Sequence, residues 1–361
     1  MNSISQDTAT TIFDIQAIDV GYYQTKFTLA SRQAVPASQV KVDRFPSIAP
    51  RLGATELILE TNQVGLDGVV VHVNGVAYVV GKDVKHQCKG SEPRDVLDDF
   101  AASDRYLALV EGAFSYMLEN AGVSGDVCIQ NLMLGLPINT YQKHSQTLKA
   151  RIVGDHFISQ RFSDSRQRVT VNNVHVIVQP RGALTNFGIS GGMSRPSDAM
   201  CLVVDVGGGT VDWFLTYGTR PHWARSGAYP KGTLACAAAV SDSINPTWRD
   251  NFSLMEKIGT ALREEAQSFT AGGENYVLAD FNSAVEAVYQ EVADKILFSL
   301  GTIDDLDCIL FTGGGGRMFG KFFVNKYPKV KRICSIDEDA LYGNLRGFFA
   351  IGQFVCPASG V

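Results

Sequence analysis

Asp205-Val-Gly-Gly-Gly-Thr-Val-Asp212 joins two predicted strands through a run of glycines and is the most informative pattern in the chain. The apolar run Met200–Val206 predicts a buried strand before the turn, and Val211–Tyr217 predicts another after it. The same order occurs near the N-terminus, where the apolar run Phe13–Val20 ends in Asp19-Val20-Gly21. This internal repeat favours two related α/β domains, each of which offers a glycine turn and a carboxylate to a shared cleft.

The length and charge of the chain narrow its class. Its 361 residues exceed the roughly 250–300 that one hydrophobic core serves, which predicts two domains. A formal net charge of −5 disfavours binding of nucleic acid over a broad surface. No apolar run reaches the ~18 residues of a transmembrane helix, and no basic segment precedes an apolar one at the N-terminus. The cysteines are scattered without a C-x-x-C pair, so we expect reduced thiols in a cytoplasmic protein that does not associate with membranes.

Local patterns predict further elements around these turns. Asn74-Gly75 between two Val-rich runs predicts a hairpin, and Asn172-Asn173 predicts another. Ser190–Ser197 is rich in Gly and Ser and predicts a boundary between domains. Cys308–Phe311 predicts a buried strand that leads into the glycine run Gly313–Gly316. Apolar periodicity predicts helices over Val96–Gly122, about Asn139–Arg151, Leu254–Phe269, Ala284–Leu300 and Ala340–Phe354.

The glycine turns indicate phosphate binding. Side chains obstruct the approach of polyphosphate oxygens to backbone N–H groups, and glycine removes that obstruction. We therefore expect the turn at Gly21 and the turn Gly207-Gly208-Gly209-Thr210 to hold phosphates from two sides, with the Lys26 ammonium near a phosphate. Asp19 and Asp205 supply hard oxygen ligands of the kind that Mg²⁺ prefers. Asp205 is the better candidate for polarising an attacking water.

Each motif has a simpler explanation when it is taken alone. An Asp-x-Gly sequence at a strand end is usually a tight turn, and a lysine in a strand is usually a surface residue. The occurrence of all these motifs in this order along one chain is more specific evidence for phosphate binding than any single motif. No G-x-x-x-x-G-K-[ST] sequence is present, which disfavours a P-loop enzyme. Gly313–Gly316 lies near the C-terminus without the βαβ unit and the acidic residue of a dinucleotide-binding fingerprint.

This order of motifs resembles the superfamily of actin, sugar kinases and heat-shock chaperone ATPases over nearly the whole chain. Asp19-Val-Gly-Tyr-Tyr-Gln-Thr-Lys26 resembles its first phosphate motif, Asp205–Asp212 its second, and Leu310–Gly316 its adenosine motif. Gln179-Pro180 matches the first connection between the domains, where the family carries a Gln or Glu that orients the attacking water. Tyr342–Phe349 resembles the second connecting helix.

Within that superfamily the chain is most similar to the ParM/StbA plasmid-segregation actins. Gly135-Leu-Pro-Ile-Asn-Thr-Tyr141 resembles the entry to one of their helices, and Val174–Ala183 resembles their connection into the second domain. Phe45-Pro-Ser-Ile-Ala49 is similar to an early segment of a ParM-like subgroup. One departure is Gln179, where ParM is expected to carry Glu. An amide orients water but cannot take its proton, which predicts slower hydrolysis or greater reliance on Asp205.

The resemblance implies a two-domain actin-like fold with a duplicated ribonuclease H-like core and a nucleotide in the interdomain cleft. Domain I would comprise residues 1–190 and 335–361, and domain II residues 191–334. Asp205 and Gln179 would be the catalytic residues, and Asp19 and Asp205 would bind Mg²⁺. ATP, with GTP as the alternative, would be bound by Gly21, Tyr22, Tyr23, Gln24, Thr25, Lys26, Gly207, Gly208, Gly209, Thr210, Gly313, Gly314, Gly315 and Gly316.

Three functions are compatible with these motifs. The favoured one is an ATP-hydrolysing protein that self-associates into filaments and segregates plasmid DNA through a DNA-bound adaptor protein. The alternatives are a non-polymerising ATPase or scaffold of the same superfamily, and a small-molecule kinase on the same core. The base pocket is expected beside Gly313–Gly316 and a helix near Glu256 and Lys257. Arg317 would either stack on the base or lie at the surface.

Overall fold

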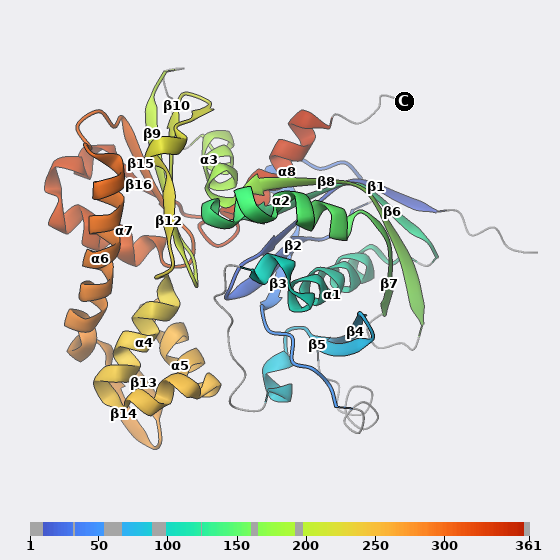
Figure 1. Ribbon diagram of the computed structural model, residues 1–361, viewed down its shortest axis with the longest axis horizontal. Coiled ribbons are helices and arrows are strands. Elements are labelled where there is room, and N and C mark those ends of the chain that lie inside the picture. Colours follow the sequence, from blue (N-terminus) through green and yellow to red (C-terminus); the bar gives the residue numbers. More distant parts are fainter. Residues whose placement is uncertain are drawn as a thin grey trace, which may run out of the picture.

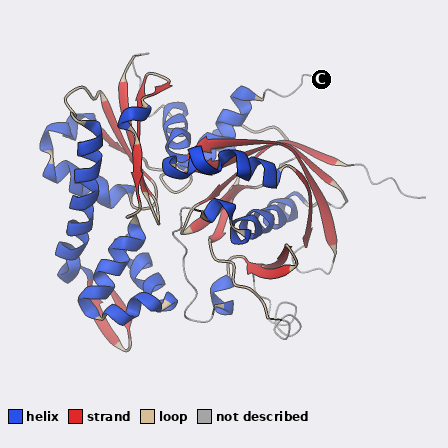
Figure 2. Cartoon of the chain, viewed as in Figure 1, coloured by secondary structure: helices blue, strands red, loops and turns tan. Residues whose placement is uncertain are grey.

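The computed structural model describes residues 10–31, 33–53, 67–88, 99–123, 125–159, 165–191 and 198–356. These residues form two α/β domains, each built on its own sheet, which lie side by side in Figure 1. Helices flank the sheets in both domains (Figure 2). The predicted two-domain α/β fold is confirmed. No helix in the described ranges is long and apolar enough to cross a membrane.

The first domain is built on a six-stranded sheet with the strand order β3-β2-β1-β6-β8-β7. β1 is antiparallel to β2 and parallel to β6, and β6 is parallel to β8. The strand register sets Asp19, near the end of β1, opposite Lys26 of β2. The strands are β1 (Thr11–Val20), β2 (Gln24–Thr28), β3 (Val42–Pro46), β6 (Val127–Leu136), β7 (Gly154–Ser159) and β8 (Arg166–Val178).

The second domain repeats the central part of this sheet. Its strand order is β11-β10-β9-β15-β16, and β12 also pairs with β10. β9 is antiparallel to β10 and parallel to β15, as β1 is to β2 and β6, so the predicted internal repeat is confirmed. The strands are β9 (Met200–Val206), β10 (Val211–Tyr217), β11 (Arg220–Pro221), β12 (Gly227–Tyr229), β15 (Cys308–Thr312) and β16 (Cys334–Ile336).

Successive residues of a strand face opposite sides of the sheet. Because β1 has apolar side chains on both sides, helices cover both faces of the first sheet. Ile18 of β1 packs in one hydrophobic cluster with Leu109 of α1, whereas the adjacent Ala17 packs in another with Phe348 of α8. The C-terminal helix α8 therefore returns to the first domain. The helices are α1 (Asp104–Ala121), α2 (Ile138–Ile152), α3 (Gln179–Ile189), α4 (Thr233–Ile244), α5 (Phe252–Arg263), α6 (Asn282–Leu300), α7 (Gly316–Lys326) and α8 (Gly343–Val355).

Two small hairpins lie outside the main sheets. β4 (Val69–Val73) and β5 (Val76–Val80) are joined through Asn74 and Gly75, which have φ angles of 49° and 77°. These left-handed residues are those of the predicted hairpin turn, which is confirmed. β13 (Ser268–Ala271) and β14 (Glu274–Val277) form the second hairpin, which the sequence analysis did not predict.

Some predicted elements differ from the structure. The hairpin at Asn172-Asn173 is wrong, because both residues lie inside the continuous strand β8, where both side chains bond to Gln130 of β6. The helix predicted over Leu254–Phe269 ends at Arg263, and its last residues form β13 instead. The helix predicted over Val96–Gly122 begins only at Asp104, because Phe100–Ala102 form a separate 3₁₀ turn and the Ser103 side chain caps α1. Residues 96–98 and most of the predicted boundary Ser190–Ser197 lie outside the described residues.

The chain passes between the domains through α3 and again before α8, and these two helices cross at glycines. A Cβ on Gly347 of α8 would lie 1.8 Å from the carbonyl oxygen of Gly182 of α3. Only glycine allows the helix backbones to approach so closely. Ala183 of α3 also packs in a cluster with Val203 and Leu310 of the second sheet. The crossing of α3 and α8 is therefore the structural link between the domains (Figure 1).

Candidate functional site

The two predicted glycine turns have the same geometry. The N–H of Gly21 donates to the carbonyl of Gln24 over 3.1 Å, and the N–H of Gly207 donates to the carbonyl of Thr210 over 2.9 Å. A Cβ on Gly21 would lie 3.3 Å from the carbonyl oxygen of Gln24, and a Cβ on Gly207 would lie 3.1 Å from that of Thr210. Both turns are therefore tight connections between antiparallel strands, with little room for a side chain.

Helix α4 fixes the direction of the peptide groups in the second turn. Three N–H groups at its start, from residues 232–234, donate to the carbonyl oxygens of residues 207–209 over 2.9 to 3.1 Å. Because the C=O and N–H of a trans peptide point in opposite directions, the N–H groups of residues 208–210 point away from α4. They form a set of oriented donors of the kind that binds anions. Helix α4 was not among the helices predicted from the sequence.

The first turn presents mainly its backbone, because several of its side chains are held within the first domain. These contacts leave the peptide N–H groups as the natural phosphate donors of this turn. The contacts are the Tyr22 ring stacked on Phe100 at 5.4 Å, the Gln24 side-chain oxygen accepting from Arg44 at 2.9 Å, and the Thr25 hydroxyl bonded to Ser47 at 2.9 Å.

Asp19 binds two protein donors at the end of β1, where it is 1% exposed. The Lys26 ammonium lies 3.0 Å from its Oδ2, and the Gln179 side-chain amide donates to its Oδ1 over 2.7 Å. Lys26 is therefore directed at Asp19, within reach of the first turn. Because the Gln179 amide NH₂ is engaged by Asp19, its carbonyl oxygen is the atom of this side chain that can accept a hydrogen bond from water.

Asp205 lies at the end of β9 and is 6% exposed. Asn344 donates to its Oδ2 over 2.6 Å. Burial raises the pKa of Asp205 to about 6, while the Asn344 hydrogen bond and the Lys26 charge lower it and the Asp19 charge raises it. A Cβ on Gly208 of the second turn would lie 2.9 Å from Tyr23 Cβ of the first, so the two turns meet and the two predicted carboxylates lie at one junction.

The third glycine turn lies against this site. The N–H of Gly315 donates to the carbonyl of Val206 over 2.9 Å, directly after Asp205. Gly313 has a φ of 79°, and a Cβ there would lie 2.3 Å from Asp205 Oδ1. Both the positive φ and the close carboxylate require glycine. Gly316 begins α7, and Gly314 faces Arg263 of α5, whose Cδ would lie 3.8 Å from a Cβ there.

Two further carboxylates surround Asp205. Asp212, at 2% exposure, accepts hydrogen bonds from the Ile138 N–H at 2.7 Å and the Thr210 hydroxyl at 2.8 Å. Burial raises the pKa of Asp212 to about 7, and the nearby charge of Asp205 adds to this rise. Because Ile138 begins α2, Asp212 joins the second turn to a helix of the first domain. Asp337 accepts from the Thr312 hydroxyl at 2.9 Å, and its charge raises the pKa of Asp205.

Asn344 is a site residue to which the sequence analysis gave no role. Its Nδ2 donates to Asp205, and its Oδ1 accepts from the N–H of Ala183 over 3.1 Å. One side chain thus connects α8, α3 and the carboxylate of the second domain. The stretch that contains Asn344 resembles a connecting helix, but no pattern in that stretch indicated a contact with Asp205.

The expected base pocket is only partly matched. Lys257 is exposed and its ammonium is 3.4 Å from the carbonyl of Thr270, and Arg317 pairs with Glu265 while its side chain is 70% exposed. The α5 residue beside the third turn is Arg263.

The residues fit a hydrated Mg²⁺ better than a directly caged metal. Within the described residues, no group of three or more His, Cys, Asp and Glu side chains is placed to hold a metal ion. Mg²⁺ usually keeps several waters and binds through one or two carboxylates and substrate phosphates. Asp19 and Asp205 provide two such carboxylates, one from each domain.

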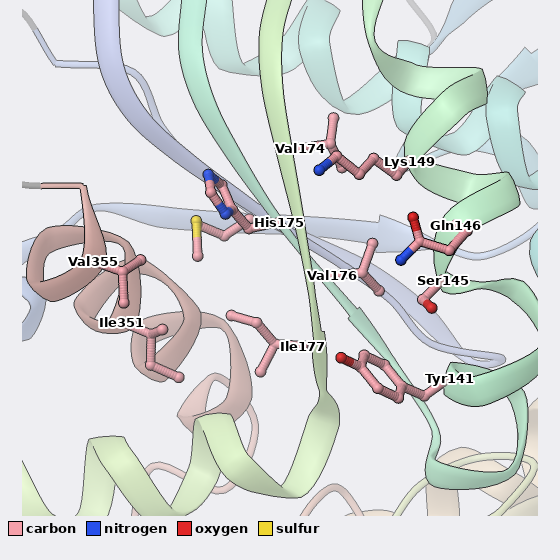
Figure 3. A pocket seen from close by; sticks show the side chains of 11 residues that line it. Tyr141, Ser145, Gln146, Lys149, Val174, His175, Val176, Ile177, Ile351 and Val355 are labelled. Atoms are coloured by element: carbon pink, nitrogen blue, oxygen red, sulfur yellow. The ribbon is translucent and has the colours of Figure 1, made fainter.

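A cavity of about 270 Å³ lies elsewhere, between α2, α8 and β8. Figure 3 shows Tyr141 and Gln146 of α2 on one side and Ile351 of α8 on the other. None of the predicted nucleotide-site residues lines it.

Two family models match the chain. Residues 17–182 match the N-terminal domain of actin-like proteins, and residues 203–325 match the C-terminal domain of the archaeal actin homologue described as MreB-like. The chain is an actin-like protein. None of the curated protein sequences compared with this actin-like protein matches it significantly.

Solved structures share the fold of this actin-like protein at low sequence identity. An archaeal actin homologue in complex with ADP superposes with a TM-score of 0.70 at 17% identity, covering 95% of this chain and 100% of the other. A 15-stranded ParM filament from Clostridium botulinum gives 0.71 at 18% identity, covering 96% and 100%. The apo ParM protein of psk41 gives 0.65 at 17% identity, covering 96% and 98%. These likenesses confirm the actin-like fold.

Proposed function

We propose that this actin-like protein binds ATP, with GTP as the alternative, together with Mg²⁺ between its two domains and hydrolyses it. The observation that carries the proposal is the meeting of two equivalent glycine turns, where a Cβ on Gly208 would lie 2.9 Å from Tyr23 Cβ. The strands that enter these turns carry Asp19 and Asp205 near their ends. A triphosphate needs donors for its oxygens and carboxylates for its metal, and this junction offers both. The archaeal homologue with ADP supports nucleotide binding by this fold.

The second turn would bind the phosphates of the nucleotide, and the third turn would contact its nucleoside. The N–H groups of residues 208–210 point away from α4 and would hold phosphate oxygens, as would those of the first turn. Gly313–Gly316 would lie against the nucleoside. Mg²⁺ would neutralise phosphate charge, held through its waters by Asp19 and Asp205.

Hydrolysis would depend on Gln179 and Asp205. The Gln179 amide is fixed by Asp19 at 2.7 Å, so its carbonyl oxygen can orient the attacking water. Asp205, whose pKa burial raises to about 6, would act as the general base and is ionised at neutral pH. Phosphoryl transfer needs mainly positioning and charge stabilisation, and these residues supply both.

The wider function that we propose is a nucleotide-dependent filament that segregates plasmid DNA through a DNA-bound adaptor protein. The ParM filament among the similar structures supports self-association. A non-polymerising ATPase or a scaffold with the same junction is the alternative.

Phosphate release from ATP tests the catalytic proposal. We expect release by the wild type with Mg²⁺ and little with EDTA. Gln179→Ala should lower turnover by ~10²-fold or more, the effect typical of groups that act on water in the transition state. Ser145→Ala, in the separate cavity of Figure 3, serves as the control and should match the wild type. Wild-type turnover by Gln179→Ala would remove this residue from the mechanism.

A further inference from the structure

Tyr23 of the first turn reaches across the junction into the second domain. Its side chain is buried, with 9% of the residue exposed. A Cβ on Gly208 would lie 2.9 Å from Tyr23 Cβ, and a Cβ on Gly259 of α5 would lie 3.1 Å from the Tyr23 hydroxyl oxygen. Glycine at both positions therefore leaves room for the tyrosine between the second turn and α5.

The guanidinium of Arg263 covers the Tyr23 ring. The Cζ of Arg263 lies 3.6 Å from the ring centroid, which is a close cation–π contact. Nη2 donates to the Thr260 hydroxyl over 3.0 Å. Nη1 is buried and has no hydrogen-bond acceptor among the described residues. A buried donor without an acceptor is costly, so Arg263 is arranged to receive a further polar partner.

The position of this pair is defined by the glycine turns. Tyr23 contacts Gly208 of the second turn, and the Cδ of Arg263 would lie 3.8 Å from a Cβ on Gly314 of the third. The stacked pair thus occupies the space between the turn proposed for phosphates and the turn proposed for the nucleoside. A flat aromatic ring therefore already lies on a flat cation, in the way that a nucleotide base would stack on it.

We propose that Arg263 is a base-binding residue and that the Tyr23 ring takes the place of the base when no nucleotide is bound. This inference rests on the proposed nucleotide function. When a nucleotide enters, Tyr23 leaves the guanidinium, the base stacks on it, and Nη1 donates to an acceptor of the base or ribose. Stacking recognises an aromatic base in general, so the pair discriminates a nucleotide from a bare polyphosphate. Since Tyr23 must leave the second domain, base binding is also linked to movement between the domains.

Calorimetric titration with MgATP and with magnesium tripolyphosphate, which has no base, tests this proposal. Arg263→Lys keeps the charge but loses the flat guanidinium. It should weaken MgATP binding about two- to tenfold, the contribution of the Nη1 hydrogen bond that forms only with the nucleotide, and leave tripolyphosphate binding unchanged. Stacking on the guanidinium is lost with and without nucleotide, so its loss changes the affinity little. Arg249→Lys is the matched control, because the side chain of this second-domain arginine is 54% exposed and paired with Asp242. It should leave both ligands unchanged.

Tyr23→Ala provides a second test of the proposal and leaves Arg263 unchanged. It removes the competitor of the base and should strengthen MgATP binding about two- to thirtyfold, the range of a cation–π contact, without strengthening tripolyphosphate binding. Equal MgATP affinity of Arg263→Lys and the wild type, or an equal loss of both ligands, would overturn the base-stacking proposal. Weaker MgATP binding by Tyr23→Ala would overturn the role of its ring as a stand-in. A wild type that binds neither ligand would refute the proposed nucleotide function itself.

Discussion

Asp205 is the side chain on which the proposed chemistry depends most. Burial raises its pKa to about 6, so the carboxylate form grows as the pH rises through 6. We predict that kcat/KM for ATP hydrolysis increases from pH 5 to 7 and then levels off, because this ratio reports ionisation of the free protein. Asp205→Ala should lower turnover by ~10²–10⁴-fold and remove the rise. A wild-type pH profile in this variant would assign the ionisation to another group.

A buried pair of ionisable side chains in the first domain affects the free energy of unfolding. His156 lies between Glu111, whose Oε1 is 3.1 Å from its Nδ1, and the carbonyl of Ile152, which is 2.9 Å from its Nε2. Both neighbours are acceptors, so the doubly protonated ring satisfies both. Burial lowers the pKa of His156, but the bonds to Glu111 and Ile152 outweigh it and raise the pKa above 6.5.

The sign of the pH effect follows from this raised pKa. The pair contributes fully to the free energy of unfolding below pH 6.5, and the contribution is lost as the pH rises through the higher folded pKa. Urea unfolding should show this decline in the wild type but not in His156→Phe. That variant should lose about 3 kcal/mol at pH 6, because Glu111 stays buried without its partner. Adding Glu111→Leu should restore much of the loss, and no restoration would contradict the pairing.

At the residue scale, the sequence was informative where one motif holds several site residues. Asp19, Gly21 and Lys26 lie within one strand–turn–strand unit, so their proximity could be predicted from local pattern. Asn344 and Arg263 could not be predicted in the same way. They reach the site from helices that are distant in sequence, and only the packing of α5 and α8 brings them to the glycine turns.

Among the elements, the crossing of α3 and α8 is the most constrained. Gly347→Ala would place a Cβ 1.8 Å from the Gly182 carbonyl oxygen, so the helices must separate. We predict a loss of about 1–3 kcal/mol in the free energy of unfolding, measured in urea. Gly188→Ala in α3 is the control, because its Cβ would meet no atom within 4 Å. It should be neutral or stabilise by about 0.4–1 kcal/mol. Equal stability of the two variants would contradict the close crossing.

Secondary structure followed the sequence where a turn has a specific chemical signal. Asn74-Gly75 tolerates positive φ at both positions and forms the predicted turn. Asn172-Asn173 lacks glycine, and both side chains instead bond to the adjacent strand β6, which keeps β8 extended. The helix ending at Arg263 was predicted too long, because apolar residues of β13 continue its pattern in the sequence.

The whole molecule has two domains that a bound triphosphate would join. Phosphates held by both turns would fix the relative orientation of the domains, and contacts between subunits that span both domains depend on that orientation. We predict that light scattering rises when MgATP is added, persists with a slowly hydrolysed analogue and falls with ADP. The change in assembly cannot exceed the difference in nucleotide affinity between the two orientations. Unchanged scattering over a wide protein concentration range, with hydrolysis intact, would favour the non-polymerising alternative.

A crystal structure with Mg²⁺ and a slowly hydrolysed ATP analogue tests the central claim most directly. We predict phosphate oxygens about 3 Å from backbone N–H groups of the first and second glycine turns. We also predict the metal and its waters between Asp19 and Asp205. A nucleotide bound elsewhere, such as the cavity between α2 and α8, with the two turns free of phosphate, would contradict it.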